Sequence, residues 1–447
     1  MKIVQKIIVL VLAAIVMSCV DRLNIAPQQS ISQEQAVSSE ANIRALLLGS
    51  YTTLSVTGNS FVMADLLGST GQVSWTGTFV GPRQIFNKKI LSYNGMIARN
   101  WRLNYKLINA VNLVLDNAYQ VSAKDRNSLK GQAYFLRAYA YFDLVRNFAP
   151  SYSARTAHTD LGVPLRLKGI VDYTTDQSIA RSTVSEVYEQ IIEDLKAAVL
   201  ALPEYNGVFA DKYAAKGLLA RVYLQKGDFE AAREQADAVI RYSGRQLLSD
   251  YSLVFNNDNN TNEDILSYQV TDQTGVNLLI TYYASQKHGG RGGDIWINSS
   301  YYAGFDSNQD VRASFVTDEY DLIKDRGGLT AKFMSKYANI TLIRLAEMYL
   351  IRAETNFRLG QSVGASPVSD INAIRNRAGA KTLKILSLAT ILRERQYELA
   401  FEGFLIHDLK RTHQSVGHLP WDADALVMPI PQSEMDTNKL MEQNKGY

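Results

Sequence analysis

Three glutamates spaced four residues apart, Glu394, Glu398 and Glu402, are the clearest candidates for acid–base chemistry in this sequence. The helical periodicity from residue 390 to 412 would place all three on one helix face, where paired carboxyl groups could act as general acid and general base. Arginines alternate with these glutamates, and opposite charges that alternate along a helix usually pair with one another. We therefore expect a structural ion-pair network and no catalytic pair; the arginines are Arg393, Arg395 and Arg411.

The histidines and an asparagine-rich stretch do not have the spacing of metal ligands. His407 and His413 are six residues apart, which places them on different faces of a helix, and no His-Glu-x-x-His sequence is present. Residues 256–264 are rich in Asn and Asp but lack the spaced acids and closing glutamate of an EF-hand calcium loop. The sequence therefore predicts no metal site and no cofactor.

A glycine-rich run, Gly289–Gly293, surrounds Arg291 and could hold an anion through backbone N–H groups. No Gly-Lys-Ser or Gly-Lys-Thr follows this run, so a nucleotide-binding loop is not indicated. The nucleophile motif Gly-x-Ser-x-Gly is also absent, and the only cysteine is Cys19, near the N-terminus. No residue is a candidate nucleophile, and we expect that the protein is not an enzyme.

Aromatic side chains in loop-rich segments are better candidates for a binding site. Trp75 and Trp296 lie in segments without helical periodicity, and tyrosine pairs occur at 282–283 and 301–302. The apolar C–H face of a sugar ring can stack on indole or phenol, while polar side chains bind its hydroxyl groups. A peptide could be held by the same kind of surface, and the aromatic residues could also simply anchor the loops. The candidate ligand-binding residues are Trp75, Tyr283, Arg291, Trp296, Tyr301 and Tyr302.

The N-terminus has the features of a bacterial lipoprotein signal. Two lysines precede an unbroken apolar run, Ile7–Val16, which has about half the length needed to span a bilayer. A small residue, Ser18, then stands directly before the only cysteine, Cys19. We therefore predict a signal peptide over residues 1–18, acylation of Cys19, and a flexible tether over residues 19–35 that holds the protein on a membrane.

The charge of the chain gives no reason to expect a nucleic-acid partner. The formal net charge is +3 over 447 residues, and the basic residues do not form a block. Hydrophobic residues make up 46% of the chain, which is enough to build one large core. We expect residues 36–447 to form a single domain after the tether.

Helical periodicity extends over most of that domain, so the predicted fold is mainly all-α. The segments at about 36–245 and 335–412 have the apolar spacing of helices. Two stretches rich in glycine, serine, threonine and asparagine interrupt the pattern at about 57–100 and 246–334. Loop-rich stretches of this length are usually functional, so we expect them to form an irregular ligand-binding face.

The first helical segment contains the spacing of a tetratricopeptide unit. Small and aromatic residues at Ala220, Tyr223 and Ala232 flank the turn pair Gly227-Asp228. Such a unit is a pair of helices with one face left open, so several pairs must stack to close a core. The sequence therefore predicts a tetratricopeptide-like helical scaffold.

Six segments, taken in order along the chain, carry a further pattern: Phe135–Arg146, Ala215–Tyr223, Arg344–Glu354, Ile371–Gly379, Glu394–Arg411 and Met428–Tyr447. Behind a lipoprotein signal, these segments resemble the SusD/RagB family of outer-membrane nutrient-binding lipoproteins of Bacteroidota. Two positions depart from the family pattern, since Leu405 stands where arginine is usual and Lys445 where proline is common. The first departure suggests a rearranged polar network beside that helix.

The resemblance implies an all-α scaffold of four tetratricopeptide-like helix pairs that serves as the lid of a SusC-like TonB-dependent transporter. The expected function is capture of a glycan or oligosaccharide on the outer face of the outer membrane and its delivery to that transporter. The alternatives are a lid of the same type that captures peptides, and a tetratricopeptide adaptor that docks proteins. The expected partners are the transporter, the ligand, and the membrane through the lipid anchor.

Overall fold

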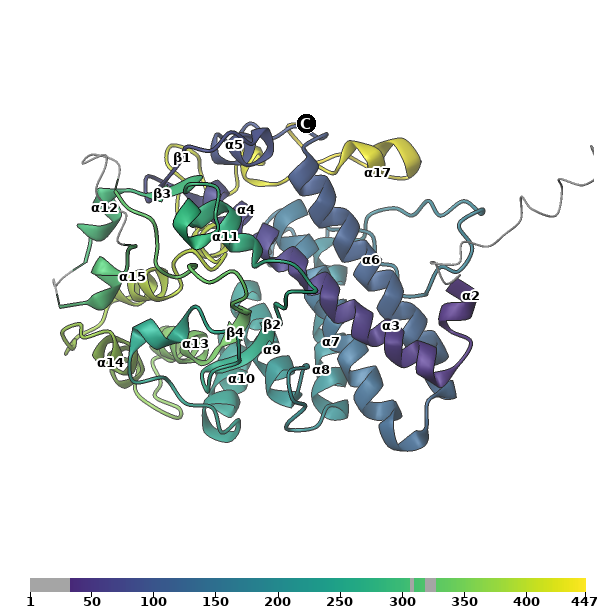
Figure 1. Cartoon of the computed structure of the whole chain (residues 1–447), viewed down its shortest axis with the longest axis horizontal. Coiled ribbons are helices and arrows are strands. Elements are labelled where there is room, and N and C mark those ends of the chain that lie inside the picture. Colours follow the sequence, from purple (N-terminus) through teal and green to yellow (C-terminus); the bar gives the residue numbers. More distant parts are fainter. Residues whose placement is uncertain (1–32, 306–308, 318–326) are drawn as a thin grey trace, which may run out of the picture.

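The computed structural model describes residues 33–305, 309–317 and 327–447; the predicted signal peptide, Cys19 and most of the tether lie outside these ranges. Helices dominate the described chain and strands are few, as the all-α prediction required (Figure 1). Within these ranges we find no helix with the length and apolar character needed to cross a membrane.

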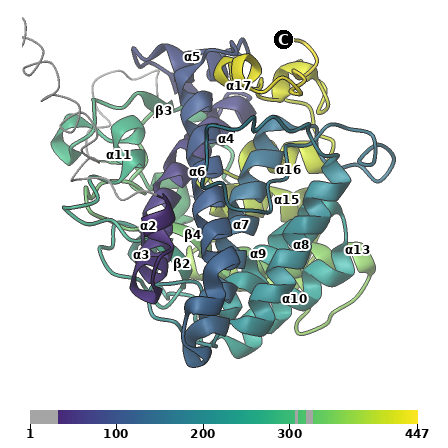
Figure 2. The same ribbon diagram turned by 90° about the vertical axis from the view of Figure 1, so that its right-hand side faces the viewer.

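Six long helices form the scaffold and pack side by side (Figures 1 and 2). Each packs on the next in the chain, and the last packs on the fifth although the second insertion separates the two in sequence. Because each helix buries apolar side chains against its neighbours, the stack closes one large core. The predicted tetratricopeptide-like scaffold is confirmed. The helices are α6 (Gly95–Asn117), α7 (Ala123–Phe148), α8 (Val184–Ala201), α9 (Lys212–Lys226), α10 (Phe229–Tyr242) and α13 (Leu345–Leu359).

The ends of these helices are encoded locally. Thr183 and Glu186 form a capping box at the start of α8, in which each side chain accepts a hydrogen bond from the other residue's backbone N–H. After α9, Gly227 takes a left-handed conformation (φ 84°), which glycine adopts without steric cost. Asp228 then caps α10 by accepting a hydrogen bond from the N–H three residues on. The Gly-Asp pair is therefore the turn between two helices, as its spacing predicted.

The first insertion, predicted to be loops over residues 57–100, begins with a buried helix, so the prediction is wrong there. α4 (Val56–Gly68) is buried along its whole length and packs against α6 and α16 (Leu405–Arg411). Its glycines allow close packing, because a Cβ at Gly68 would lie 2.7 Å from the backbone N of Ile406. A helix buried on all sides has no alternation of polar and apolar faces, and this is why the periodicity did not reveal it.

The shorter elements join the two insertions to each other and to the scaffold. β1 (Val73–Trp75) pairs antiparallel with β3 (Ile295–Ile297), so segments more than 200 residues apart meet in one small sheet. A second antiparallel pair, β2 with β4, leads directly into α13. The other strands and helices are β2 (Asp264–Tyr268), β4 (Ile340–Arg344), α2 (Gln33–Ala36), α3 (Glu40–Thr52), α5 (Val80–Phe86), α11 (Leu278–Tyr283), α12 (Ser299–Tyr302), α14 (Pro367–Arg377) and α17 (Gln432–Thr437).

The single helix predicted over residues 390–412 is interrupted. α15 (Leu388–Glu398) is followed by a turn in which Phe401 and Gly403 take left-handed conformations with φ of 66° and 78°, and α16 begins after it. A Cβ at Gly403 would lie 2.5 Å from a phenylalanine ring of α4, so the turn needs glycine at that position. The prediction of one continuous helix is wrong, and Glu402 lies in the turn.

Candidate functional site

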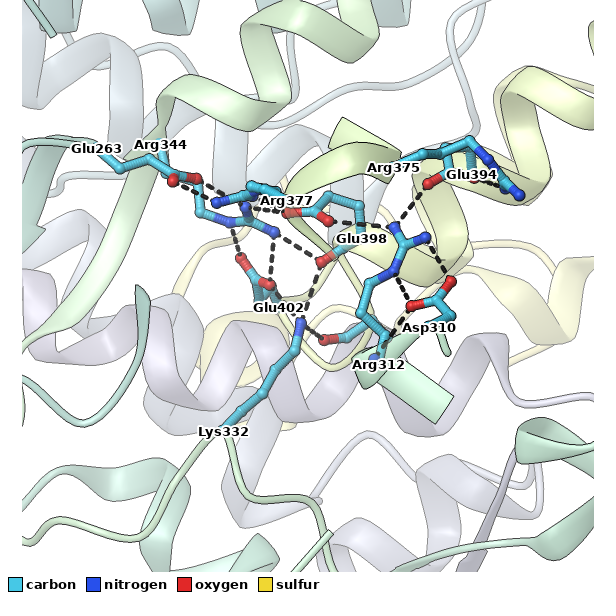
Figure 3. A network of polar contacts seen from close by, with 11 residues as sticks. Glu263, Asp310, Arg312, Lys332, Arg344, Arg375, Arg377, Glu394, Glu398 and Glu402 are labelled. Atoms are coloured by element: carbon cyan, nitrogen blue, oxygen red, sulfur yellow. Dashed lines mark hydrogen bonds and ion pairs between the residues drawn. The ribbon is translucent and has the colours of Figure 1, made fainter. Parts of the chain in front are cut away.

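The three glutamates singled out by their spacing lie in a buried network of ion pairs (Figure 3). At its centre, the Glu398 carboxylate lies 2.6 Å from Arg344 and 3.3 Å from Arg312, and it also pairs with Arg377. Burial opposes ionisation, but the charges of these arginines outweigh it and hold the pKa of Glu398 below its ordinary value. The prediction that these glutamates belong to a structural ion-pair network is confirmed, but two of the arginines named with them pair with other carboxylates, Arg395 with Asp408 and Arg411 with Glu354. Among the described residues its members are Arg312, Lys332, Arg344, Arg375, Arg377, Glu263, Asp310, Glu394, Glu398 and Glu402.

Two cations of this network come from the second insertion and fasten it to the scaffold. Arg312 reaches Glu394 of α15 at 2.6 Å. Lys332 pairs with Glu402 at 2.7 Å and also donates to two backbone carbonyl oxygens, one at the end of α15 and one in the turn after it. The loops on either side of these residues are therefore held by buried charges as well as by apolar packing, and one of them carries β3.

The two tryptophans predicted to contribute to one stacking surface lie on opposite faces of the β1–β3 sheet. In the strand register, Ser74 is opposite Trp296 and Trp75 is opposite Ile295. Successive side chains of a strand point to opposite faces, so Trp75 shares its face with the buried Ile295 and Trp296 lies on the other face. Both indoles are partly exposed. They do not form one surface.

Tyr283 and Tyr301, also candidate ligand contacts, are buried. Tyr283 is completely buried, and its hydroxyl group donates a 2.9 Å hydrogen bond to Oδ2 of Asp65. Tyr301 is 8% exposed and meets Tyr302 and Phe305 edge to face. Tyr302 is partly exposed beside it. The structure thus leaves almost no ring surface of Tyr283 or Tyr301 for a ligand, and both rings anchor the loops, which was the alternative considered for the aromatic residues.

A group of aromatic and charged side chains lies where β1, α5 and α11 meet; Tyr282 and Asp294 are buried in it, and Trp75, Phe79 and Arg291 reach solvent. The ring centroids of Trp75 and Phe79 each lie 6.3 Å from that of Tyr282. The guanidinium carbon of Arg291 lies 3.8 Å from the centroid of the Phe79 ring, and its Nε lies 3.2 Å from Asp294. Phe79 and the side chain of Arg291 are each 39% exposed, so solvent reaches the group. We call these five residues the aromatic cluster.

Gly77 makes the close packing of the aromatic cluster possible, because a Cβ there would lie 2.6 Å from both the Trp75 ring and the carboxyl carbon of Asp294. Burial raises the pKa of Asp294, and the charge of Arg291 acts in the opposite direction. The indole N–H of Trp75 is buried and has no hydrogen-bond partner among the described residues. The cluster therefore offers the partly exposed rings of Trp75 and Phe79 and the N–H donors of Arg291 at one place.

Sequence reasoning identified two members of the aromatic cluster, Trp75 and Arg291, and missed Phe79, Tyr282 and Asp294. Phe79 could have been included, because it lies in the same loop-rich stretch as Trp75. Asp294 follows the glycine run directly, but nothing in the sequence indicates that it faces an aromatic ring. In the described ranges no group of three His, Cys, Asp or Glu side chains could hold a metal ion.

Two models of one protein family match the chain. A model described as "Starch-binding associating with outer membrane" matches residues 23–224, and a model described as "SusD family" matches residues 325–427. The chain belongs to the SusD family. SusD family proteins are binding proteins that associate with the outer membrane. The two matches do not overlap: the first ends within α9 and the second contains α13, so α10 lies outside both.

Similar proteins agree with this assignment to the SusD family. "SusD-like protein P2" of Formosa agariphila is 27% identical over 99% of this chain and 99% of its own length. "Starch-binding protein SusD" of Bacteroides thetaiotaomicron is 32% identical over a shorter stretch, 24% of this chain and 22% of its own length. A solved structure from Bacteroides vulgatus has a TM-score of 0.80 at 26% identity and covers 94% of this chain and 100% of that one.

One departure from the SusD family pattern has a structural consequence. Leu405 lines an apolar cavity of about 440 Å³ between α15 and α16. It also packs against α4, where a Cβ at Gly68 would lie 2.9 Å from Leu405 Cγ. At this position the side chain therefore takes part in apolar packing, and the rearranged polar network beside the helix stays a prediction.

Proposed function

We propose that this protein captures an oligosaccharide at the cell surface through the aromatic cluster and delivers it to a SusC-like TonB-dependent transporter of the outer membrane. The observation that carries the proposal is the pair of partly exposed rings, Trp75 and Phe79, that lie against Tyr282 beside the Arg291–Asp294 ion pair. Rings stack on the C–H face of a sugar while the charged pair binds its hydroxyl groups. The starch-binding description of the family model and the name of the partly matching Bacteroides thetaiotaomicron protein support the same ligand class.

Capture of a peptide is less well supported by the geometry of this face. An extended peptide usually binds by adding a strand to a sheet edge. β1 and β3 are only three residues long, and Ile297 of β3 is already bridged on its other side to Gly328. A peptide would therefore find few backbone hydrogen bonds on this sheet.

A tetratricopeptide adaptor is also less well supported. Such a protein would present a bare helical face to its partner. In this chain the second insertion is fastened to the scaffold by the buried charges of Arg312 and Lys332. Buried ion pairs of this kind are costly to desolvate, so they indicate that the position of the inserted loops matters for the function.

Truncating the aromatic cluster should weaken glycan binding. We expect Trp75→Ala and Phe79→Ala each to weaken binding by ~1 kcal/mol or more, the scale of losing an aromatic contact. The measurement is isothermal titration calorimetry with oligosaccharides that bind in an array screen, beginning with malto-oligosaccharides. No hydrolysis product should be detected after prolonged incubation with the bound oligosaccharide.

Trp296→Ala is the matched control, because it removes an indole from the opposite face of the same two-stranded sheet. We expect this variant to keep its binding free energy within about 0.5 kcal/mol of the wild type, as for residues outside a hot spot. Equal losses for Trp75→Ala and Trp296→Ala would show that the ligand does not bind on one face. Unchanged affinity in both cluster variants would show that the ligand binds elsewhere.

The protein should be isolated as a complex with its transporter. A binding protein on the outer surface moves nothing inward by itself, so a channel must accept the ligand. A stable complex should bury well over ~1,000 Å² and survive gentle detergent extraction. The measurement is affinity purification of the tagged protein from its native membrane, followed by mass spectrometry. Recovery of the protein alone, in a state that still binds its glycan, would contradict the lid model.

A further inference from the structure

A second concave surface, a groove of about 640 Å³, lies beside α6 and shares no residue with the aromatic cluster. Its walls are α6, the middle of α3 at Leu46, the loop around residues 164–178, and the residues around α17. In Figure 1, α3 and α6 lie on the right, whereas β3 and α12 lie on the left. We call this surface the α6 groove; the residues used below are Arg102, Tyr105, Lys106, Asn109, Arg166 and Tyr173.

Positive charge predominates along the α6 groove. Arg102 and Lys106, four residues apart on α6, are both exposed, and Arg166 faces the groove from the loop opposite. Neither Arg102 nor Lys106 has an ion pair or hydrogen bond among the described residues. Among the described lining residues the one carboxylate is Glu434, which already accepts hydrogen bonds from Trp101 Nε1 at 3.3 Å and Asn438 Nδ2 at 3.1 Å. Like charges at this helical spacing slightly destabilise a helix, so the pair of Arg102 and Lys106 does not stabilise the fold.

The wall opposite α6 is fixed in place and carries an aromatic ring. Asn109 holds it by accepting a 2.7 Å hydrogen bond from the N–H of Ile170 and donating a 3.0 Å bond to the hydroxyl of Tyr173. Tyr105 of α6 donates a 2.9 Å hydrogen bond to the carbonyl oxygen of Pro164. The Tyr173 side chain is nevertheless 61% exposed at the rim. The groove is therefore preformed, with Arg166 and the Tyr173 ring on the loop side and Arg102 and Lys106 on the α6 side.

We propose that the α6 groove binds an anionic sugar, with the sugar ring against Tyr173 and its carboxylate, sulfate or phosphate group near Arg102, Lys106 and Arg166. Guanidinium and ammonium groups bind such anions strongly, and an aromatic ring binds the apolar face of the sugar. This site goes beyond the proposed function and does not depend on it, because it shares no residue with the aromatic cluster.

The anionic sugar has two possible sources, a free acidic oligosaccharide and a phosphorylated sugar headgroup of the outer membrane. Ala36, at the end of α2, lines the groove, so the described chain begins beside it. Residues 20–32, between the predicted anchor at Cys19 and this helix, could span at most about 45 Å when fully extended. A groove this close to the start of the body is within reach of the membrane to which the anchor would hold it.

The test compares the full-length mature protein with its Arg102→Glu/Lys106→Glu variant by calorimetry against tetragalacturonate, with maltotetraose as the neutral probe. We expect the wild type to bind tetragalacturonate, with affinity that falls as salt rises from about 50 mM to about 500 mM. The double variant should lose at least tenfold in affinity. Lys196→Glu, at an exposed lysine of α8, is the matched control and should bind as the wild type does.

A second measurement, sedimentation with lipid vesicles that do or do not contain phosphorylated sugar headgroups, separates the two sources. Binding of tetragalacturonate alone assigns a free oligosaccharide, and binding of the phosphorylated vesicles alone assigns the headgroup. Three outcomes overturn the proposal: no binding of either probe, equal binding by the wild type and the double variant, or binding that appears only after residues 20–32 are removed. The last outcome would show that the chain's own N-terminal segment covers the groove.

Discussion

Replacing Glu398 with glutamine should lower the free energy of unfolding by about 3–5 kcal/mol, the cost of breaking a buried ion pair from one side. The Glu398 carboxylate pairs with Arg312, Arg344 and Arg377, so the substitution removes a buried negative charge from beside three guanidinium groups. Glutamine has nearly the same size as glutamate, so the loss would come from charge and not from packing. The measurement is urea-induced unfolding followed by circular dichroism, compared with the wild type.

The matched control is Glu230→Gln, at an ion pair whose glutamate is 69% exposed. Exposed pairs contribute little, so this variant should unfold within about 0.5 kcal/mol of the wild type. A loss of less than about 1 kcal/mol for Glu398→Gln would contradict the role assigned to the buried network.

The stability of the wild type should also depend on pH in the acidic range. The pKa of Glu398 is lower in the folded protein than its ordinary value of 4.5, and the pKa of Glu354, close to Arg411 and Arg358, is lowered to about 2. The unfolded chain therefore binds more protons than the folded one as the pH falls below about 4.5, and the stabilising contribution is lost there. Above that pH both carboxylates are ionised in both states, and their full contribution is present.

The scaffold could be predicted from the sequence because its helices are long and three of them, α6, α8 and α10, have one polar and one apolar face. Their ends are set by short-range signals, such as the Gly227-Asp228 turn, that do not depend on distant parts of the chain. α4 could not be predicted in this way, since all of its residues are buried and its composition resembles that of a loop. The end of α15 depends on contacts with α4, a distant segment, so the local sequence did not predict the break in this helix.

The candidate site could be predicted only in part, because side-chain direction depends on pairing between distant segments. Residue types alone identified the correct loop-rich stretches and two members of the aromatic cluster. The choice between Tyr282 and Tyr283 could not be made, because consecutive residues of a helix point in directions about 100° apart and either could face outward. The opposite orientations of Trp75 and Trp296 follow from a strand register that joins segments more than 200 residues apart.

The buried ion-pair network could also be predicted only in part from the sequence. The glutamates of α15 and the alternating arginines indicated ion pairing, and both are paired, but not with each other in the pairs that decide the network: Glu394 pairs with Arg375, and Arg395 pairs with Asp408. The partners that matter most for the site, Arg312 and Lys332, come from the second insertion, and no spacing rule connects them with Glu394 or Glu402. Long-range charge pairing of this kind requires the folded structure.

Replacing Cys19 with alanine should abolish lipid attachment to the protein. Acylation takes place on the cysteine sulfur, and Cys19 is the only cysteine in the chain, so no other thiol can take its place. Each buried methylene of an attached acyl chain contributes about 0.8 kcal/mol to membrane binding, so several chains on one cysteine would hold the protein firmly. The measurement is metabolic labelling with an alkynyl fatty acid, together with separation of membrane and soluble fractions.

Ser30→Ala, within the predicted tether, is the matched control, because it changes a small polar residue near Cys19 and keeps the thiol. This variant should be labelled as the wild type is and remain with the membrane. The Cys19→Ala protein should keep the wild-type circular dichroism spectrum and affinity for its glycan, since the described scaffold begins after the tether. If it were still fully labelled, acylation would occur at another group and the lipoprotein signal assigned to residues 1–18 would be wrong. If it lost its label but stayed with the membrane, release by detergent together with a TonB-dependent transporter would show that docking alone can hold it there.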